Sequence, residues 1–168
     1  MFSKIYLNSG YHQLELTPDI RYIATFSAHR GVRRYTLLNF GTSSAAEVFE
    51  DAIQQILSGI QGVRNVTDDI NILGRDQQAH DRALDAVFAR LRTKNLTLNP
   101  TKCEFNKSTI NFFGYTFSKN GVSPDPKKVA TINNAKPPSN AHEFRSFLGM
   151  TNYCSRFIPI YSTITAPL

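Results

Sequence analysis

Two adjacent carboxylates between two short strand-like runs constrain this chain more than any other feature. Asp68 and Asp69 lie between residues 63–67 and 70–73, both rich in residues that favour strands. The pattern predicts a β-hairpin with the carboxylates at its tip. The two side chains repel each other unless water or a cation separates them, and no lysine or arginine is close to them in the sequence. A solvated turn and a divalent-cation site of a nucleotidyl-transfer enzyme both fit this pattern.

Composition indicates a globular protein whose positive charge is concentrated near the C-terminus. The 168 residues are 41% hydrophobic, which is enough for one well-buried domain with a small appendage. The formal net charge is +6, and residues 101–168 carry eight Lys or Arg against three Asp or Glu. Such an excess suits a polyanionic partner, although ordinary basic proteins are also common.

The cysteines and the apolar runs restrict the cellular location. Cys103 and Cys154 lack the spacing of a metal site, so two reduced thiols are expected. No secretory signal is recognised, and no apolar run approaches the length of a membrane span. A cytoplasmic or nuclear protein with no membrane partner is therefore expected.

Hydrophobic periodicity predicts a mixed helix–strand body over residues 1–122 and a small basic helical module over residues 123–168. The strands outside the central hairpin are expected at residues 2–7, 11–16, 22–26, 33–38, 103–105 and 110–118, with a turn at 119–121. The first helix is expected after a cap at Ser43 or Ser44, with Ser44 and Glu47 in a capping-box pattern. The others are expected after Asp76, from Pro126 to about Asn133, and after an Asn140–Glu143 capping pair.

A series of short strings runs through the whole chain in the order of one family. The strings are Phe2-Ser3-Lys4-Ile5, Leu7-Asn8-Ser9-Gly10-Tyr11-His12-Gln13, Asn39-Phe40-Gly41-Thr42-Ser43-Ser44-Ala45, Asp68-Asp69-Ile70, Leu96-Thr97-Leu98-Asn99, Lys102-Cys103-Glu104-Phe105, Phe112-Phe113-Gly114, Gly121-Val122-Ser123-Pro124-Asp125, Arg145-Ser146-Phe147-Leu148-Gly149-Met150 and Asn152-Tyr153. The chain resembles the palm and thumb of a reverse transcriptase from a gypsy-class LTR retrotransposon.

The resemblance implies an α+β fold. Residues 1–122 would form a reverse-transcriptase-like palm, with an antiparallel sheet, packed helices and partial fingers. Residues 123–168 would form a thumb or connection-like helical module. The family's N-terminal finger segment and its ribonuclease H domain have no counterpart in these 168 residues.

The resemblance also implies a two-metal site. In the family, the Asp pair binds Mg²⁺ or Mn²⁺ with a third carboxylate from the first strand, so Asp68 and Asp69 are the implied catalytic and metal-binding residues. The third carboxylate falls at Tyr6, whose phenol is neutral at working pH and is a poor ligand for Mg²⁺. Lys102 matches a lysine that helps to protonate pyrophosphate, although a solvated lysine is an equally fair interpretation. Metal binding is therefore expected to be weakened or lost.

The remaining implied positions concern nucleotide and nucleic acid, with an RNA or DNA template–primer as partner. The implied nucleotide-binding residues are Tyr11, Phe40 and Gly41. The implied primer- and nucleic-acid-binding residues are Phe113, Gly114, Tyr115, Lys127 and Lys128.

Three hypotheses follow for function. The first is a working RNA-directed DNA polymerase module. The second is an inactive relic or repurposed domain that binds nucleic acid through its basic residues, and the third is a protein-interaction module with the same fold. Tyr6 and the missing finger segment favour the second or third hypothesis.

Overall fold

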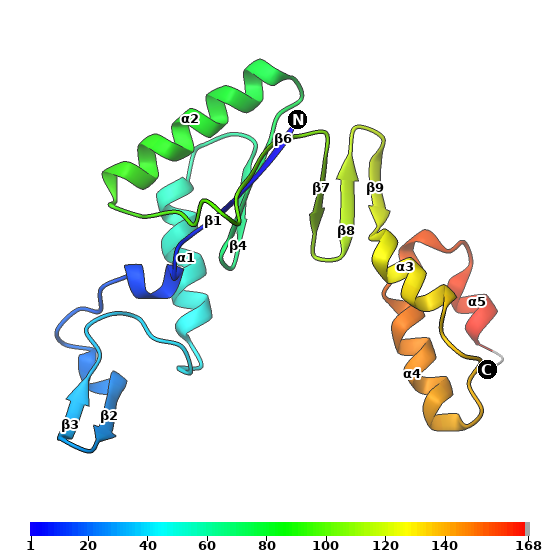
Figure 1. Cartoon of the computed structure of the whole chain (residues 1–168), viewed down its shortest axis with the longest axis horizontal. Helices are drawn as coiled ribbons and strands as arrows, with labels where there is room; N and C mark the ends of the chain where they lie inside the picture. Colours follow the sequence, from blue (N-terminus) through cyan, green and yellow to red (C-terminus); the bar gives the residue numbers. More distant parts are fainter. Residues whose placement is uncertain (167–168) are drawn as a thin grey trace. The chain divides into compact units, whose positions relative to one another are not determined.

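The computed structural model describes residues 1–166, which fall into two compact units (Figure 1). Unit 1 is Met1–Lys107, and unit 2 begins at Ser108. The boundary between the two units lies earlier in the chain than the boundary at 122/123 that the sequence predicts. The reason is that the strands after Ser108 pair with one another in a sheet of their own. The assignment of residues 1–122 to a palm and of residues 123–168 to a thumb stays a prediction.

Unit 1 contains a four-stranded antiparallel sheet. Its strand order is β4-β5-β1-β6, with bounds of Val63–Val66, Asp69–Leu73, Phe2–Tyr6 and Glu104–Lys107 respectively. Thr67 adopts a left-handed conformation with φ 49° in the turn between β4 and β5. The predicted hairpin over residues 63–73 is therefore confirmed, with the Asp pair at its tip.

The core of unit 1 lies between one face of this sheet and two helices (Figure 1). Helices α1 (Ala45–Leu57) and α2 (Gln77–Thr93) pack against Ile5, Ile70 and Ile72, which are fully buried. Because successive strand residues point to opposite faces, the side chains next to these isoleucines in the sequence lie on the other face of the sheet. The sheet therefore separates its apolar core face from the face that carries the Asp69 side chain.

One of the two caps expected in unit 1 forms. Asp76 caps α2 as predicted, because its Oδ1 accepts a hydrogen bond from the Ala79 N–H at 2.7 Å. The capping box at Ser44 and Glu47 was wrong. Ser44 precedes α1 with φ −86° and ψ −4°, which is already helical, and its side chain makes no capping hydrogen bond.

Two expected strands near the N-terminus are short 3₁₀ helices instead. Residues Gly10–Gln13 form the first, where strand 11–16 was expected, because the buried Tyr11 ring packs into the core and breaks the alternation. Arg21–Ala24 forms the second and leads into β2 (Thr25–Ala28), which pairs with β3 (Gly31–Arg34).

Unit 2 contains a three-stranded antiparallel sheet followed by short helices. The expected strand over residues 110–118 is divided into β7 (Thr109–Phe112) and β8 (Tyr115–Ser118) by a turn at Phe113 and Gly114. The turn at residues 119–121 joins β8 to β9 as predicted. The remaining elements are β9 (Gly121–Pro124), α3 (Pro126–Asn133), α4 (Ala141–Asn152), a 3₁₀ turn at Ser155–Phe157 and α5 (Tyr161–Thr165).

The Asn140 cap of α4 is confirmed, since its Oδ1 accepts a hydrogen bond from the Glu143 N–H at 2.9 Å. The Glu143 carboxylate in turn accepts hydrogen bonds from the N–H and the hydroxyl of Ser139. Within residues 1–166, no helix combines the length and the apolar character needed to cross a bilayer.

Candidate functional site

Tyr6 lies directly beside the Asp pair. The register of β1 and β5 places Tyr6 opposite Asp69. On its other side, the Tyr6 carbonyl accepts a hydrogen bond from the Asn99 N–H at 2.9 Å, and the Tyr6 N–H donates to Cys103 Sγ at 3.4 Å. The backbone of residue 6 is thus held on both sides, next to the hairpin tip, as predicted.

The ammonium group of Lys4 lies close to both the Asp69 carboxylate and the Tyr6 ring. Lys4 Nζ lies 2.9 Å from Asp69 Oδ2 and 4.8 Å from the centre of the Tyr6 ring. The Lys4 residue is only 8% exposed. No basic residue is close to the Asp pair in the sequence, but Lys4, which is remote in sequence, reaches Asp69 across the sheet.

The surroundings of Lys4 favour its charged form. Burial lowers the pKa of Lys4, but the hydrogen bond to Asp69, a hydrogen bond with Tyr6 and the Asp69 charge together outweigh it and raise the pKa above its usual value. Lys4 is therefore an ammonium ion at neutral pH. The sequence contained one indication that Lys4 lies near Tyr6. The two residues are two positions apart on one strand, so their side chains share a face of the sheet.

Asp68 differs from Asp69 in its environment. Its Oδ1 atom is buried without a hydrogen-bond partner. Burial, and then the charge of Asp69, raise the pKa of the Asp68 carboxyl, while Lys102 acts in the opposite direction. A Cβ atom on Gly10 would lie 2.7 Å from Phe49 Cζ and 3.3 Å from this oxygen, so the glycine makes room first for the Phe49 ring and then for the carboxylate. Lys102 thus lies within electrostatic reach of the Asp pair.

The residues around the hairpin tip do not fit a two-metal centre. Such a centre needs several charged or carbonyl oxygens around each ion. The tip supplies two carboxylates, one of them paired with Lys4, and the neutral phenol of Tyr6. Over residues 1–166, no group of three or more His, Cys, Asp or Glu side chains is placed to hold a metal ion.

The implied nucleotide-binding residues gather near Asp68. The Tyr11 ring stacks on Phe49 with 4.6 Å between centroids and contacts Phe40 at 4.7 Å. Burial, then the charges of Asp68 and Glu50, raise the pKa of Tyr11. Phe40 is 58% exposed, so its face is open to a ligand.

Gly41 adopts a φ of 93°, which residues with a side chain rarely adopt. A Cβ atom at this position would meet open space. The backbone conformation alone therefore explains this glycine, without any close approach of a ligand.

Four of the five implied nucleic-acid-binding residues of unit 2 form one cluster with Tyr153. Tyr115 stacks on Tyr153 with 5.2 Å between centroids, and Lys128 Nζ lies 3.7 Å from the centre of the Tyr153 ring. The Tyr153 hydroxyl donates a hydrogen bond to the Phe113 carbonyl. The cluster joins the β7–β8 turn to α3 and to the end of α4. Lys127, the fifth residue, is exposed on α3.

Gly114→Ala is expected to destabilise unit 2 by about 1–3 kcal/mol. Gly114 has a φ of 71°, and an added Cβ would collide with the Tyr153 hydroxyl and lie 2.8 Å from Lys128 Cε. A urea titration followed by circular dichroism measures the loss. Gly59→Ala is the matched control, because Gly59 has a similar positive φ (81°) but open space around it. Equal losses would show that backbone strain alone acts at Gly114.

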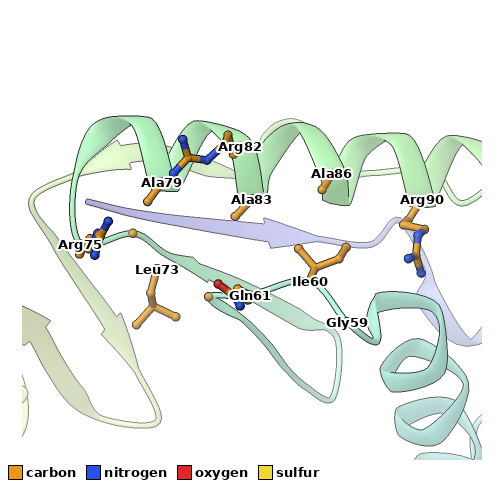
Figure 2. Close-up of a pocket in the computed structure, with 12 residues that line it drawn as sticks. Gly59, Ile60, Gln61, Leu73, Arg75, Ala79, Arg82, Ala83, Ala86 and Arg90 are labelled. Carbon is orange, nitrogen blue, oxygen red and sulfur yellow. The ribbon is translucent and has the colours of Figure 1, made fainter.

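A separate groove of about 680 Å³ lies in unit 1 along α2 (Figure 2). Figure 2 shows alanines of α2 on one side and Leu73 and Gln61 on the other. Its lining includes Arg75, Arg82 and Arg90 and no acidic residue. Arg75 pairs with Asp76, and Arg90 donates to the Ile56 carbonyl at 2.9 Å. None of the implied site residues lines this groove.

Comparison with known protein families identifies the family to which this chain belongs. The family model described as reverse transcriptase (RNA-dependent DNA polymerase) matches residues 1–117. The chain belongs to the reverse transcriptase family. Curated relatives of this reverse transcriptase domain include the transposon Tf2-3 and Tf2-7 polyproteins of Schizosaccharomyces pombe, which are 34% and 33% identical over 170 aligned residues. All of this chain is covered, but it spans only 13% of each polyprotein.

Solved reverse transcriptase structures share the fold. A foamy viral protease–reverse transcriptase in complex with double-stranded DNA has a TM-score of 0.87 at 24% identity, over 99% of this chain and 29% of that one. A foamy viral protease–reverse transcriptase in complex with an RNA/DNA hybrid has a TM-score of 0.82 at 24% identity, over 99% of this chain and 23% of that one. The expected α+β fold, with antiparallel sheets and packed helices, is confirmed.

Proposed function

We propose that this chain is a palm-and-thumb portion of a gypsy-class LTR retrotransposon reverse transcriptase that has lost nucleotidyl transfer and retains binding of template–primer nucleic acid. One observation carries the loss of activity. Tyr6 stands at the strand position that would supply the third carboxylate, and its neutral side chain lies beside Asp69 and Lys4. In this proposal Asp68, Asp69 and Lys102 are the remnants of the catalytic site.

Retained nucleic-acid binding is supported by charge and by the relatives. Residues 101–168 hold eight Lys or Arg against three acids, and phosphate contacts account for most sequence-independent binding. The foamy viral structures contain double-stranded DNA or an RNA/DNA hybrid. Stacked aromatic rings beside a lysine, as in the Tyr115, Tyr153 and Lys128 cluster, suit a nucleic-acid strand.

The proposal predicts salt-sensitive binding that is largely independent of sequence. A labelled RNA/DNA or DNA/DNA duplex, titrated at several salt concentrations, should show affinity that falls with a log–log slope of about 0.9 for each phosphate neutralised. The double substitution Lys127→Gln and Lys128→Gln should weaken binding and lower that slope by about 2, or about 1 per lysine. Glutamine keeps the inner half of the aliphatic stem, and both lysines are exposed, so unit 2 should stay folded.

A matched control removes two charges from unit 1. Arg75→Gln with Arg82→Gln takes the same charge from the groove along α2 (Figure 2). This variant should bind duplex almost as the wild type does. No binding at low salt, or equal losses in the two double variants, would count against the proposed nucleic-acid surface.

A second candidate function is a protein-interaction module. It is favoured by exposed apolar side chains on the β2–β3 hairpin and the 3₁₀ turn before it. Tyr22, Ile23 and Val32 are 62%, 61% and 67% exposed, and clustered exposed apolar groups of this kind mark contact surfaces. An absence of duplex binding at low salt would make this candidate the better one.

A further inference from the structure

The face of the unit 1 sheet that carries Asp69 holds a short polar strip. Lys4 and Tyr6 lie on β1, and Asn71 and Asp69 lie opposite them on β5. Lys4 and Asn71 are 8% and 5% exposed. A charged lysine is rarely buried to this extent unless an opposite charge compensates it. The strip is thus built around one ion pair.

We propose that the Lys4 ammonium is the resident cation of this site, so that the chain folds and binds nucleic acid without a divalent metal ion. The inference rests on the proposed function, which treats the Asp pair as the remnant of a metal site. Lys4 supplies what a metal ion would otherwise supply, a positive charge within contact distance of Asp69. The contact is 2.9 Å between Nζ and Oδ2.

The neighbours of Lys4 hold its ammonium in place. The Tyr6 ring lies 4.8 Å from Nζ, and the electron-rich face of an aromatic ring attracts a cation. The Tyr6 hydroxyl is a further hydrogen-bond partner of the ammonium. With an aspartate at residue 6, three carboxylates would face the one ammonium, instead of the two that face it now. The tyrosine and the lysine therefore act together, and both belong to β1.

A divalent ion would compete directly with this ammonium. Mg²⁺ and Mn²⁺ bind carboxylate oxygens at about 2.1 Å, which would place either ion on Asp69 within a few ångströms of Nζ. The two positive charges would repel each other, and the Asp68 oxygen alone cannot offset the repulsion. Because Tyr6 replaces the third carboxylate, Lys4 is expected to exclude the metal ion here, and removing its charge should admit one.

The test compares Lys4→Met with Lys107→Met in the full chain. Lys107 lies on β6 of the same sheet but is exposed, so its substitution removes the same charge without touching Asp69. The melting temperature is measured in chelator and in Mg²⁺ or Mn²⁺ at matched ionic strength. Uptake of Mn²⁺ is measured separately by electron paramagnetic resonance, which reports the free ion.

The wild type and Lys107→Met should each have the same melting temperature in chelator and in divalent ions. Neither protein should take up Mn²⁺ at millimolar concentration. Lys4→Met should melt roughly 5–15 °C lower in chelator, because the half-buried Asp69 carboxylate loses its partner. It should recover much of this loss in Mn²⁺ and take up the ion.

Saturable Mn²⁺ uptake by the wild type, or identical behaviour of the two variants, would overturn the inference. If Lys4→Met does not fold in either buffer, the wild-type titration decides alone. Duplex binding is measured independently in chelator. A wild type that binds no duplex in any buffer counts against the proposed function and leaves the Mn²⁺ result intact, whereas binding that requires Mg²⁺ counts against the resident ammonium.

Discussion

Purified wild-type protein is expected to extend no primer above background, with template–primer, deoxynucleotides and either Mg²⁺ or Mn²⁺ present. The hairpin tip offers two carboxylates, and Lys4 already pairs with one of them. Loss of metal-centred charge stabilisation raises the barrier by several kcal/mol, which lowers the rate by more than about a thousandfold. Extension products resolved on a denaturing gel measure this directly.

Two variants make the primer-extension result interpretable. Tyr6→Asp should gain Mn²⁺ uptake, because three carboxylates would then surround one ammonium. Asp68→Asn shows whether any primer extension by the wild type depends on the Asp68 carboxylate. Extension by the wild type that disappears in Asp68→Asn would show that the site is active and that the proposed loss is wrong. Extension that persists in Asp68→Asn would point to a contaminating polymerase.

Phe49→Ala is expected to lower the free energy of unfolding by about 3–5 kcal/mol. Phe49 on α1 is fully buried, and its ring stacks on Tyr11 at 4.6 Å. Truncation removes this burial and leaves a cavity beneath the 3₁₀ turn that carries Gly10 and Tyr11. A urea titration followed by circular dichroism measures the change.

Phe40→Ala is the matched control for Phe49→Ala. Phe40 contacts the same Tyr11 ring at 4.7 Å between centroids, but it is 58% exposed. Its truncation should cost less than about 1 kcal/mol, as surface substitutions usually do. A loss equal to that of Phe49→Ala would mean that contact with Tyr11, rather than burial in the core, determines the stability of this region.

Local patterns predicted most of the elements that position the site. The hairpin around Asp68 and Asp69, the cap at Asp76 and the cap at Asn140 depend on residues that are close in sequence, and each forms as expected. The position of Tyr6 beside Asp69 followed from the family resemblance, and the strand register confirms it. The roles of the site residues in nucleotide and primer binding stay predictions.

Features set by contacts between distant residues were not predicted. Lys4 reaches Asp69 only because β1 and β5 pair, and the sequence near Asp69 carries no sign of this. The alternation from Tyr11 onward favoured a strand, but the packing of Tyr11 on Phe49 produces a 3₁₀ turn. At Ser44 the sequence matched a capping box, yet the backbone is already helical there and the side chain makes no cap.

The backbone bonds that hold residue 6 have a consequence for how a coding sequence of this kind changes over time. The Tyr6 N–H donates to the Cys103 thiol, its carbonyl accepts from the Asn99 N–H, and the strand pairing uses main-chain atoms, so none of these bonds requires a particular side chain at residue 6. Codons for aspartate and tyrosine differ only in the first base. A single point mutation can therefore exchange a metal ligand for a phenol while the strand keeps its register. Metal binding and folding therefore place separate demands on this codon. A copy that loses the metal ligand can still produce a folded protein.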